Sequence, residues 1–250
     1  MSASERRQAP PAVAVSTVVF ALHPPAGAFV GDDTGEFVED PDGDAVTIWI
    51  PLVRRTRPPF EGTWALPGGP IEWNETLIDT ALRNLLAAVG QEPGYLEQLY
   101  SFGGLERSAE AQRVVTIAYW ALYSAHEDAE SGAQAGSSDQ NVAWFSADSL
   151  PRLAFDHADI VDYALQRLRL KTSYSTVAYR FLGEVFTLGQ LRQVHEAVLG
   201  QRVDPANFRR QVLAQGHLVD TGETQKGTPF RPARLYRFRA GPDHEQRSTP

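Results

Sequence analysis

Residues 64–91 constrain the fold more than any other stretch, because they combine a glycine-rich loop with a capped amphipathic helix. Trp64–Pro67 is predicted to end a strand, and Gly68–Gly69 provides a backbone that can take positive φ and approach a ligand closely. Asn74 is the predicted N-cap, and Glu75 falls in the first turn, where the helix dipole favours an acidic side chain. Gly90 stands where a left-handed C-cap belongs. Apolar residues at helical spacing form the buried face between them: Leu77, Ala81, Leu82, Leu85, Leu86 and Val89.

The spacing within this stretch resembles the signature of the Nudix family, G-x5-E-x7-R-E-U-x-E-E-x-G-U, in which U is a bulky aliphatic residue. The positions that match are Gly69, Glu75, Arg83, Leu85 and Gly90. The glycines and the leucine shape the loop–helix unit. Glu75 and Arg83 can form an ion pair that ties its two ends together.

The three glutamate positions of that signature carry Asn84, Ala87 and Ala88 here, and Gln91 replaces the last aliphatic residue. Positions 84, 87 and 88 share one helix face. In Nudix hydrolases this face carries the carboxylates that hold Mg²⁺ or Mn²⁺ on a diphosphate. Because a hard cation needs several oxygen ligands, usually carboxylates, we predict no metal site, no cofactor and no catalytic residue. The resemblance implies a domain that binds a nucleoside-diphosphate-like ligand without hydrolysing it.

Composition and charge divide the chain into two modules. Its 250 residues are 42% hydrophobic and 22% charged, enough for one large or two small domains with a real core. The absence of cysteine excludes disulfides and fits the cytoplasm. No apolar run reaches the ~18–20 residues that span a bilayer, and the alternating apolar run 12–22 favours a strand over a signal peptide.

The net charge of −8 is unevenly distributed. Residues 1–170 hold 11 basic and 24 acidic side chains, whereas residues 171–250 hold 12 basic and 7 acidic ones. A basic segment on an acidic protein suggests a module that meets a polyanion. We therefore expect a disordered N-terminus at 1–11, an effector-binding domain at 12–170, a DNA-binding domain at 171–240 and a disordered tail at 241–250.

Several strands are predicted in the first module. The strand at Ala45–Arg54 is expected to pair with the strand at Ala12–Leu22. The long acidic loop between them lacks the spacing of a calcium site. Asp156 is expected to cap a helix at Ala158–Leu170, and His157 is better explained by its place at the helix terminus than by a general-base role. The predicted strands are Ala12–Leu22, Ala45–Arg54, Tyr95–Phe102, Arg113–Ser124 and Val142–Ser146.

Candidate ligand-binding residues lie around the glycine loop and at neighbouring strand ends. Arginine can grip phosphate bidentately, although solvated charges at a strand end are an equal alternative. Trp64, Trp73 and Phe102 can stack on a base, although each such aromatic is more often simply core. The predicted ligand-binding set is Arg54, Arg55, Trp64, Gly68, Gly69, Glu75, Phe102, Arg107 and Arg113.

The second module has the element order of a winged helix-turn-helix. We predict helices at Tyr174–Gly183, Leu188–Leu199 and Ala206–Gln215, followed by strands at Leu218–Thr221 and Leu235–Phe238. The third helix would enter the major groove of DNA, where arginine suits guanine and asparagine suits adenine. Basic residues of the wing would contact phosphates or the minor groove. The predicted DNA-binding set is Lys171, Asn207, Arg209, Arg210, Lys226, Arg231 and Arg234.

A degenerate Nudix domain followed by a winged helix resembles the NrtR-type Nudix-related transcriptional regulators. The resemblance covers nearly the whole chain and includes WALPGGPI at 64–71, YLEQLYSFGGLERS at 95–108, LAFDHADI at 153–160, FTLGQLRQVHEAVLG at 186–200, NFRRQVL at 207–213 and RPARLY at 231–236. It implies an α+β chain: a Nudix α/β/α sandwich with a mixed sheet, plus the winged helix.

The resemblance also implies a function. The expected protein is a dimeric bacterial repressor of NAD biosynthesis genes, which binds a palindromic operator and senses ADP-ribose or NAD. Two alternatives remain open from the sequence. One is a hydrolase of ADP-ribose-like nucleoside diphosphates with relocated metal ligands such as Glu72, Glu75 and Asp79. The other is a module whose winged helix binds a protein instead of DNA.

Overall fold

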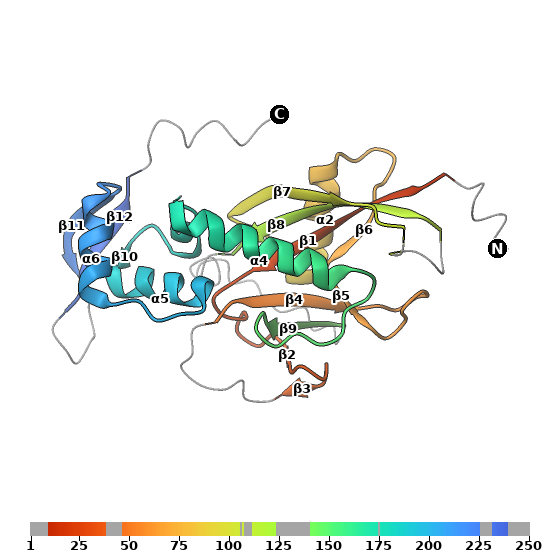
Figure 1. Cartoon of the computed structure of the whole chain (residues 1–250), viewed down its shortest axis with the longest axis horizontal. Coiled ribbons are helices and arrows are strands. Elements are labelled where there is room, and N and C mark those ends of the chain that lie inside the picture. Colours follow the sequence, from red (N-terminus) through yellow and green to blue (C-terminus); the bar gives the residue numbers. More distant parts are fainter. Residues whose placement is uncertain are drawn as a thin grey trace.

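The structure is a computed structural model that describes residues 10–38, 47–105, 107, 112–123, 141–174, 176–225 and 232–239. Figure 1 shows two sheets and their helices at one end of the molecule, and a smaller helical part with its own sheet at the other. Residues 1–9 and 241–250, predicted as disordered, lie outside the described residues.

The first sheet has the strand order β6-β1-β8-β7. Its centre is β1 (Ala12–Phe20), which runs parallel to β8 (Val114–Leu122) along the whole length of both strands. β6 (Gly68–Pro70) pairs antiparallel with β1, and β7 (Tyr95–Phe102) pairs antiparallel with β8. From Val15 onward β1 is buried on both faces, as is typical of a strand at the centre of a covered sheet.

The second sheet has the order β3-β2-β9-β4-β5 and consists mostly of short strands. β4 and β9 were predicted, and the strand end predicted at Trp64–Pro67 corresponds to β5. β2 and β3 were not predicted, because two-residue strands leave no periodic pattern in a sequence. Its members are β3 (Phe37–Val38), β2 (Val30–Gly31), β9 (Val142–Ser146), β4 (Trp49–Arg54) and β5 (Trp64–Ala65).

The expected pairing of the second predicted strand with the first was wrong. β4 pairs with β9 and β5 in the second sheet, and it meets the end of β1 only through the isolated bridge between Ala21 and Trp49. A long connection leaves the partner of a strand undetermined. Pairing β4 with β1 or with β9 would bury the same apolar side chains. The apolar pattern of the sequence therefore does not distinguish the two pairings.

Helix α2 (Leu77–Val89) begins later than predicted. Thr76, rather than Asn74, is the N-cap: its hydroxyl accepts from Asp79 N at 3.2 Å, and the Asp79 carboxylate accepts from Thr76 N at 2.9 Å. This reciprocal capping box satisfies two backbone N–H groups, whereas a lone asparagine satisfies one. The predicted C-cap is confirmed, since Gly90 has φ 83° and its N–H donates to Leu86 O.

Helix α4 (His157–Tyr174) joins the two parts of the molecule. It crosses in front of the first sheet in Figure 1, with α2 behind that sheet, so the sheet is covered by a helix on each side. The helix continues four residues beyond the predicted end at Leu170, across the expected domain boundary. Its apolar face is buried: Ile160, Val161, Ala164, Leu165 and Leu168. None of the described helices combines the length and apolar character that a bilayer crossing requires.

The C-terminal part contains η2 (Thr176–Phe181), α5 (Leu188–Leu199), α6 (Pro205–Ala214) and the sheet β10-β12-β11. Thr187 caps α5 and Asp204 caps α6. The first predicted helix is instead the short 3₁₀ helix η2. The sheet gains β10 (Phe186–Thr187) beside β12 (Arg234–Phe238) and β11 (Leu218–Thr224). One apolar core runs from Trp120 through Leu168 and Phe181 to Leu191, so the two parts share buried packing.

Candidate functional site

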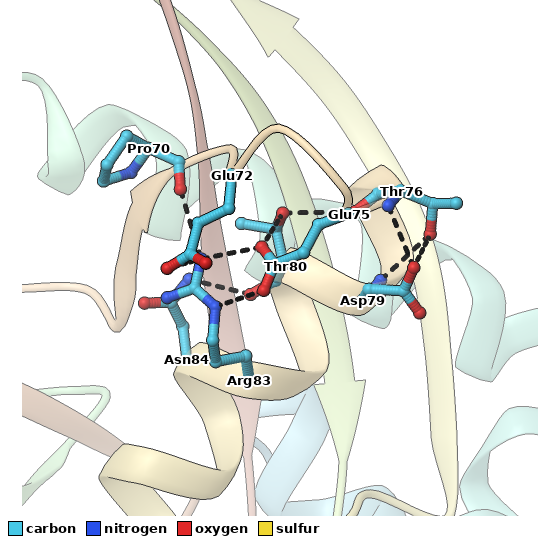
Figure 2. A network of polar contacts seen from close by, with 8 residues as sticks. All are labelled: Pro70, Glu72, Glu75, Thr76, Asp79, Thr80, Arg83 and Asn84. Carbon is cyan, nitrogen blue, oxygen red and sulfur yellow. Dashed lines mark hydrogen bonds and ion pairs between the residues drawn. The ribbon is translucent and has the colours of Figure 1, made fainter.

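The loop before α2 and the helix itself are tied together by an ion pair, as predicted. Arg83 Nε donates to Glu75 Oε1 at 2.6 Å, and Arg83 Nη2 donates to Glu75 Oε2 at 2.8 Å (Figure 2). Thr80 Oγ1 adds a hydrogen bond to Glu75 at 2.8 Å. The hydrogen bonds from Arg83 lower the pKa of Glu75 to about 2, so the carboxylate is ionised, and both of its oxygens accept hydrogen bonds.

The helix face that carries carboxylates in Nudix hydrolases is differently built here. Asn84 turns its amide back on the helix and donates to Thr80 O at 2.7 Å. Ala88 is buried and Ala87 is exposed. Nearby carboxylates are used elsewhere, since Asp79 caps the helix and Glu72 lies 3.8 Å from Arg83. Among the described residues, no three His, Cys, Asp or Glu side chains are grouped as a metal site.

The two glycines of the loop serve packing rather than unusual backbone angles. The sequence suggested positive φ at Gly68 and Gly69, but neither is among the positive-φ residues; both lie in strand β6. A Cβ at Gly68 would lie 2.4 Å from Val15 O, in the backbone of β1. A Cβ at Gly69 would lie 3.1 Å from Asn84 Oδ1. Small residues are therefore needed because β6 lies close against both β1 and α2.

The arginines after β4 bind their own loop. Arg54 Nε donates to Gly62 O at 3.1 Å, and its guanidinium lies 5.8 Å from the Trp64 ring centroid. Arg55 Nε donates to Pro59 O at 2.8 Å, and its guanidinium lies 4.8 Å from the Phe155 ring centroid. Burial lowers the pKa of Arg55. The side chain of Arg55 thereby connects the loop after β4 to the loop before α4.

Phe60 and Phe155 bring these two loops together. Their rings lie 4.8 Å apart in an edge-to-face arrangement, and both residues have positive φ, 63° and 54°. Aromatic residues rarely adopt this backbone region, and strain of this kind clusters at functional sites. The sequence offered no signal for either residue, since both belong to irregular loops.

A buried histidine lies beside two arginines at the start of α4. His157 is 5% exposed, and its Nδ1 accepts from Leu66 N at 3.0 Å. Burial, followed by the positive charges of Arg107 and Arg55, lowers the pKa of His157 to about 3. The imidazole is therefore neutral at physiological pH. Arg55 and Arg107, predicted from separate segments, are thus brought to one place.

Arg107 is fixed from two sides. Its Nη2 lies 3.0 Å from Asp156 Oδ1, and its Nη1 donates to Phe102 O at 2.9 Å. The Asp156 carboxylate, predicted to cap α4, faces this guanidinium. Arg113 belongs to the same loop region, since its Nη2 donates to Gly103 O at 3.5 Å.

The predicted aromatic residues have different environments. Trp64 is 4% exposed and donates its Nε1–H to Gly35 O at 3.1 Å, so it is a core residue that offers no face to a base. Trp73 is fully exposed. Phe102 packs with Tyr100 and Tyr163, whose rings lie 5.6 and 6.0 Å away. Sequence reasoning missed these two tyrosines, because β7 and α4 meet only in the folded chain.

In the C-terminal part, α6 presents the predicted polar face. Asn207, Arg209 and Arg210 are exposed, whereas Phe208 and Val212 are buried. Arg210 Nη2 donates to Asn207 Oδ1 at 2.7 Å. Lys226 and Arg231 lie outside the described residues.

A groove of about 850 Å³ lies where α6, the start of α5 and the wing meet. Two arginines border it, Arg209 from α6 and Arg234 from β12. The remaining lining residues are Leu188, Gly189, Thr224, Pro232, Ala233 and Tyr236.

Lys171, expected among the DNA-binding residues, faces the other way. Its Nζ pairs with the Glu97 carboxylate and donates to Tyr95 Oη at 3.2 Å. The ammonium also lies 5.4 Å from the Trp120 ring centroid, and the side chain is 15% exposed. It is held against the first sheet because the longer α4 carries it past β7 instead of into the second module.

Two sequence profiles match the chain. The NUDIX domain matches residues 18–164, and the NrtR DNA-binding winged helix domain matches residues 178–238. The "ADPR responsive transcriptional repressor NtrR" of Acinetobacter baylyi is 32% identical over 201 residues, 78% of this chain and 77% of the relative. The chain belongs to the NrtR family of Nudix-related regulators.

The solved structures agree with this NrtR assignment. The crystal structure of Shewanella oneidensis NrtR complexed with a 27mer DNA is 33% identical, covers 91% of this chain and 93% of its own, and has a TM-score of 0.71. The NUDIX match ends within α4 and the NrtR winged helix match begins within η2, so α4 bridges the interval. The predicted α+β fold class is confirmed.

A hydrolase is also among the relatives of this NrtR chain. The ADP-ribose pyrophosphatase of Methanocaldococcus jannaschii is 31% identical over 115 residues, which is 46% of this chain and 64% of the relative. Its similarity is thus confined to less than half of the chain.

Proposed function

We propose that this chain is an ADP-ribose-responsive transcriptional repressor whose Nudix domain senses the metabolite without hydrolysing it. The A. baylyi relative of that description aligns with both modules, and the Shewanella NrtR structure with DNA has the same two-part fold. ADP-ribose is the preferred effector and NAD the second choice. The regulated genes would be those of NAD biosynthesis.

One observation carries the proposal for a sensor. The scaffold of the Nudix helix is retained, with its Arg83–Glu75 pair and its capped ends, while Asn84, Ala87 and Ala88 provide no carboxylate. Without carboxylate oxygens there is no site for the cation that would activate water or neutralise a diphosphate. A sensor benefits from this combination, because it keeps its signal intact.

The effector would be held near the arginines around His157. Arg55 and Arg107 act on the same buried imidazole, and Arg113 lies on the same loop as Arg107. Guanidinium groups suit the two phosphates of ADP-ribose. Phe102, with Tyr100 and Tyr163 beside it, offers aromatic faces for the base.

DNA would be bound by a homodimer through α6 and the wing. Asn207, Arg209 and Arg210 would read base edges in the major groove, and Arg234 would contact phosphate. Two such helices suit a palindromic operator with half-sites about one helical turn apart. The effector then acts by linkage: it favours a dimer geometry whose helix spacing does not fit the operator.

A hydrolase with relocated ligands is the second candidate, and the side-chain contacts count against it. Glu75 would have to leave Arg83 and Thr80, and Asp79 would have to leave the N-cap of α2. Each loss removes a charge-assisted hydrogen bond from the scaffold.

The test is a titration of a labelled promoter fragment, taken upstream of an NAD-synthesis operon of the source genome, at a stated salt concentration. We expect saturable binding that a scrambled duplex does not show and that ADP-ribose weakens. A paired assay for AMP release from ADP-ribose covers the hydrolase. Absence of specific binding, or metal-dependent AMP release at enzymatic rates, would refute the proposal. Arg209→Ala is expected to weaken binding, whereas Arg152→Ala, which removes an exposed arginine just before α4, serves as a charge-matched control.

A further inference from the structure

The wing of the C-terminal module carries a carboxylate, Asp220, that pairs with one of the arginines at the border of the groove. Asp220 Oδ2 accepts from Arg234 Nη1 at 2.8 Å, and Asp220 Oδ1 accepts from Gly222 N at 2.9 Å. Both oxygens are therefore held, one by the wing backbone and one by the opposite strand. Asp220 is not free to swing away from the groove without breaking both bonds.

Strand register places this carboxylate on the face of the wing that looks toward α6. Asp220 stands opposite Tyr236, and Arg234 lies two residues from Tyr236 on the same strand. Side chains at these positions share one face of the sheet. Tyr236 and Arg234 line the groove with Arg209, so Asp220 belongs to the same side of the wing.

The charge of Asp220 offsets that of Arg234 at the border of the groove. The hydrogen bond from Gly222 N and then the one from Arg234 lower the pKa of the Asp220 carboxyl, and the hydrogen bond to Asp220 raises the pKa of Arg234. The groove has less net positive charge than its arginines suggest.

A carboxylate at this place is unfavourable for a phosphate. Most of the affinity of proteins for arbitrary DNA comes from phosphate contacts, and each neutralised phosphate steepens the salt dependence. Arg234 must leave or share Asp220 when a phosphate approaches. Releasing Arg234 from Asp220 costs the same free energy on every DNA sequence. Base contacts by α6 compensate for that cost only at a matching site.

We propose that Asp220 is a specificity-determining residue: it restrains Arg234, so that phosphate contacts alone bind DNA weakly and operator binding depends on base contacts. This inference rests on the proposed function, because it assumes that α6 and the wing bind DNA. It assigns to an acidic side chain the role of limiting non-specific binding.

The experiment compares the full-length chain with Asp220→Asn, which keeps the size of the side chain and removes its charge. Binding to a fluorescein-labelled scrambled duplex is measured by anisotropy between about 50 and 200 mM salt, alongside the promoter fragment. We expect Asp220→Asn to bind the scrambled duplex roughly threefold more tightly at the low-salt end. The plot of log affinity against log salt should steepen by up to about 0.9, and the ratio of promoter to scrambled affinity should fall.

Two further variants separate charge from shape. Asp220→Glu retains the charge and should stay near the wild type, and Asp162→Asn removes an exposed charge from α4 and should change neither slope nor ratio. Thermal melting confirms that each variant is folded. Unchanged or weaker binding of Asp220→Asn to the scrambled duplex would overturn the inference. Failure of the wild type to prefer the promoter fragment would count against the proposed function instead, since the scrambled-duplex comparison does not depend on that preference.

Discussion

Arg180 lies over the ring of Tyr95, with its Cζ 5.9 Å from the ring centroid. Arg180 belongs to η2, within the winged helix match, and Tyr95 begins β7 of the Nudix sheet. Beside them Glu97 pairs with Lys171 and lies 3.6 Å from Arg167, both on α4. Charged and aromatic side chains thus join the Nudix sheet to the winged-helix module at the point where α4 ends. A ligand that shifts β7 would change these contacts.

Replacing Lys171 with alanine is expected to destabilise the protein without changing DNA contacts. The substitution removes the ammonium from the partly buried Glu97 carboxylate and leaves it with Tyr95 Oη and the more distant Arg167, which costs about 1–3 kcal/mol of unfolding free energy. Urea denaturation measures this loss. The salt dependence of DNA binding should keep its wild-type slope, whereas Arg234→Ala, which removes a proposed phosphate contact, should reduce the slope. A reduced slope for Lys171→Ala would contradict this prediction and would indicate that Lys171 contacts DNA.

The glycine pair in β6 provides an internally controlled prediction. Gly68→Ala should destabilise the fold by about 2 kcal/mol or more, because its Cβ would lie 2.4 Å from the carbonyl oxygen of Val15 in a strand paired on both sides. Gly69→Ala should cost about 1 kcal/mol or less, since it meets only the amide of Asn84 at 3.1 Å, which can shift. Equal losses in denaturant titrations would show that backbone proximity is not the cause.

The free energy of unfolding is expected to decrease in mild acid because His157 is buried in its neutral form. Its pKa is lowered from 6.5 to about 3 by burial and by the charges of Arg107 and Arg55. Below about pH 6.5 the unfolded chain binds a proton that the native state refuses, so the unfolding free energy decreases by up to about 1.4 kcal/mol per pH unit. His157→Gln should flatten this part of the profile. His23→Gln, which changes an exposed imidazole, is the control; an unchanged slope in His157→Gln would contradict the assignment.

Metal removal should leave effector binding intact. Because positions 84, 87 and 88 carry no carboxylate, the rise in melting temperature caused by ADP-ribose should be equal in EDTA and in Mg²⁺. No AMP should accumulate in either condition, with an ADP-ribose pyrophosphatase as the positive control. A shift that requires the metal would mean that relocated ligands such as Glu72 bind it.

Much of the candidate site was predictable because it is local in the sequence. The Gly69-to-Gly90 spacing predicted the Nudix loop and helix, and the ion pair between Glu75 and Arg83 follows from it. The exposure of Asn207, Arg209 and Arg210 on α6 agrees with their prediction as DNA-binding residues. Details that depend on competition between neighbours were less accessible, as when Thr76 with Asp79 displaced Asn74 from the N-cap of α2.

By itself the sequence determined the two-module architecture, the helix faces and the loss of the metal-binding carboxylates, because these are properties of residue type and periodic spacing along a short stretch. Only the tertiary structure decided that Arg55 and Arg107 share His157, that Lys171 faces Glu97, and that Asp220 pairs with Arg234. Each of these pairs joins elements that are brought together by strand register or by the length of α4. The partner of a charged side chain is fixed only when the chain folds. Whether a basic residue pairs within the protein or remains available to bind DNA therefore depends on the elements packed around it.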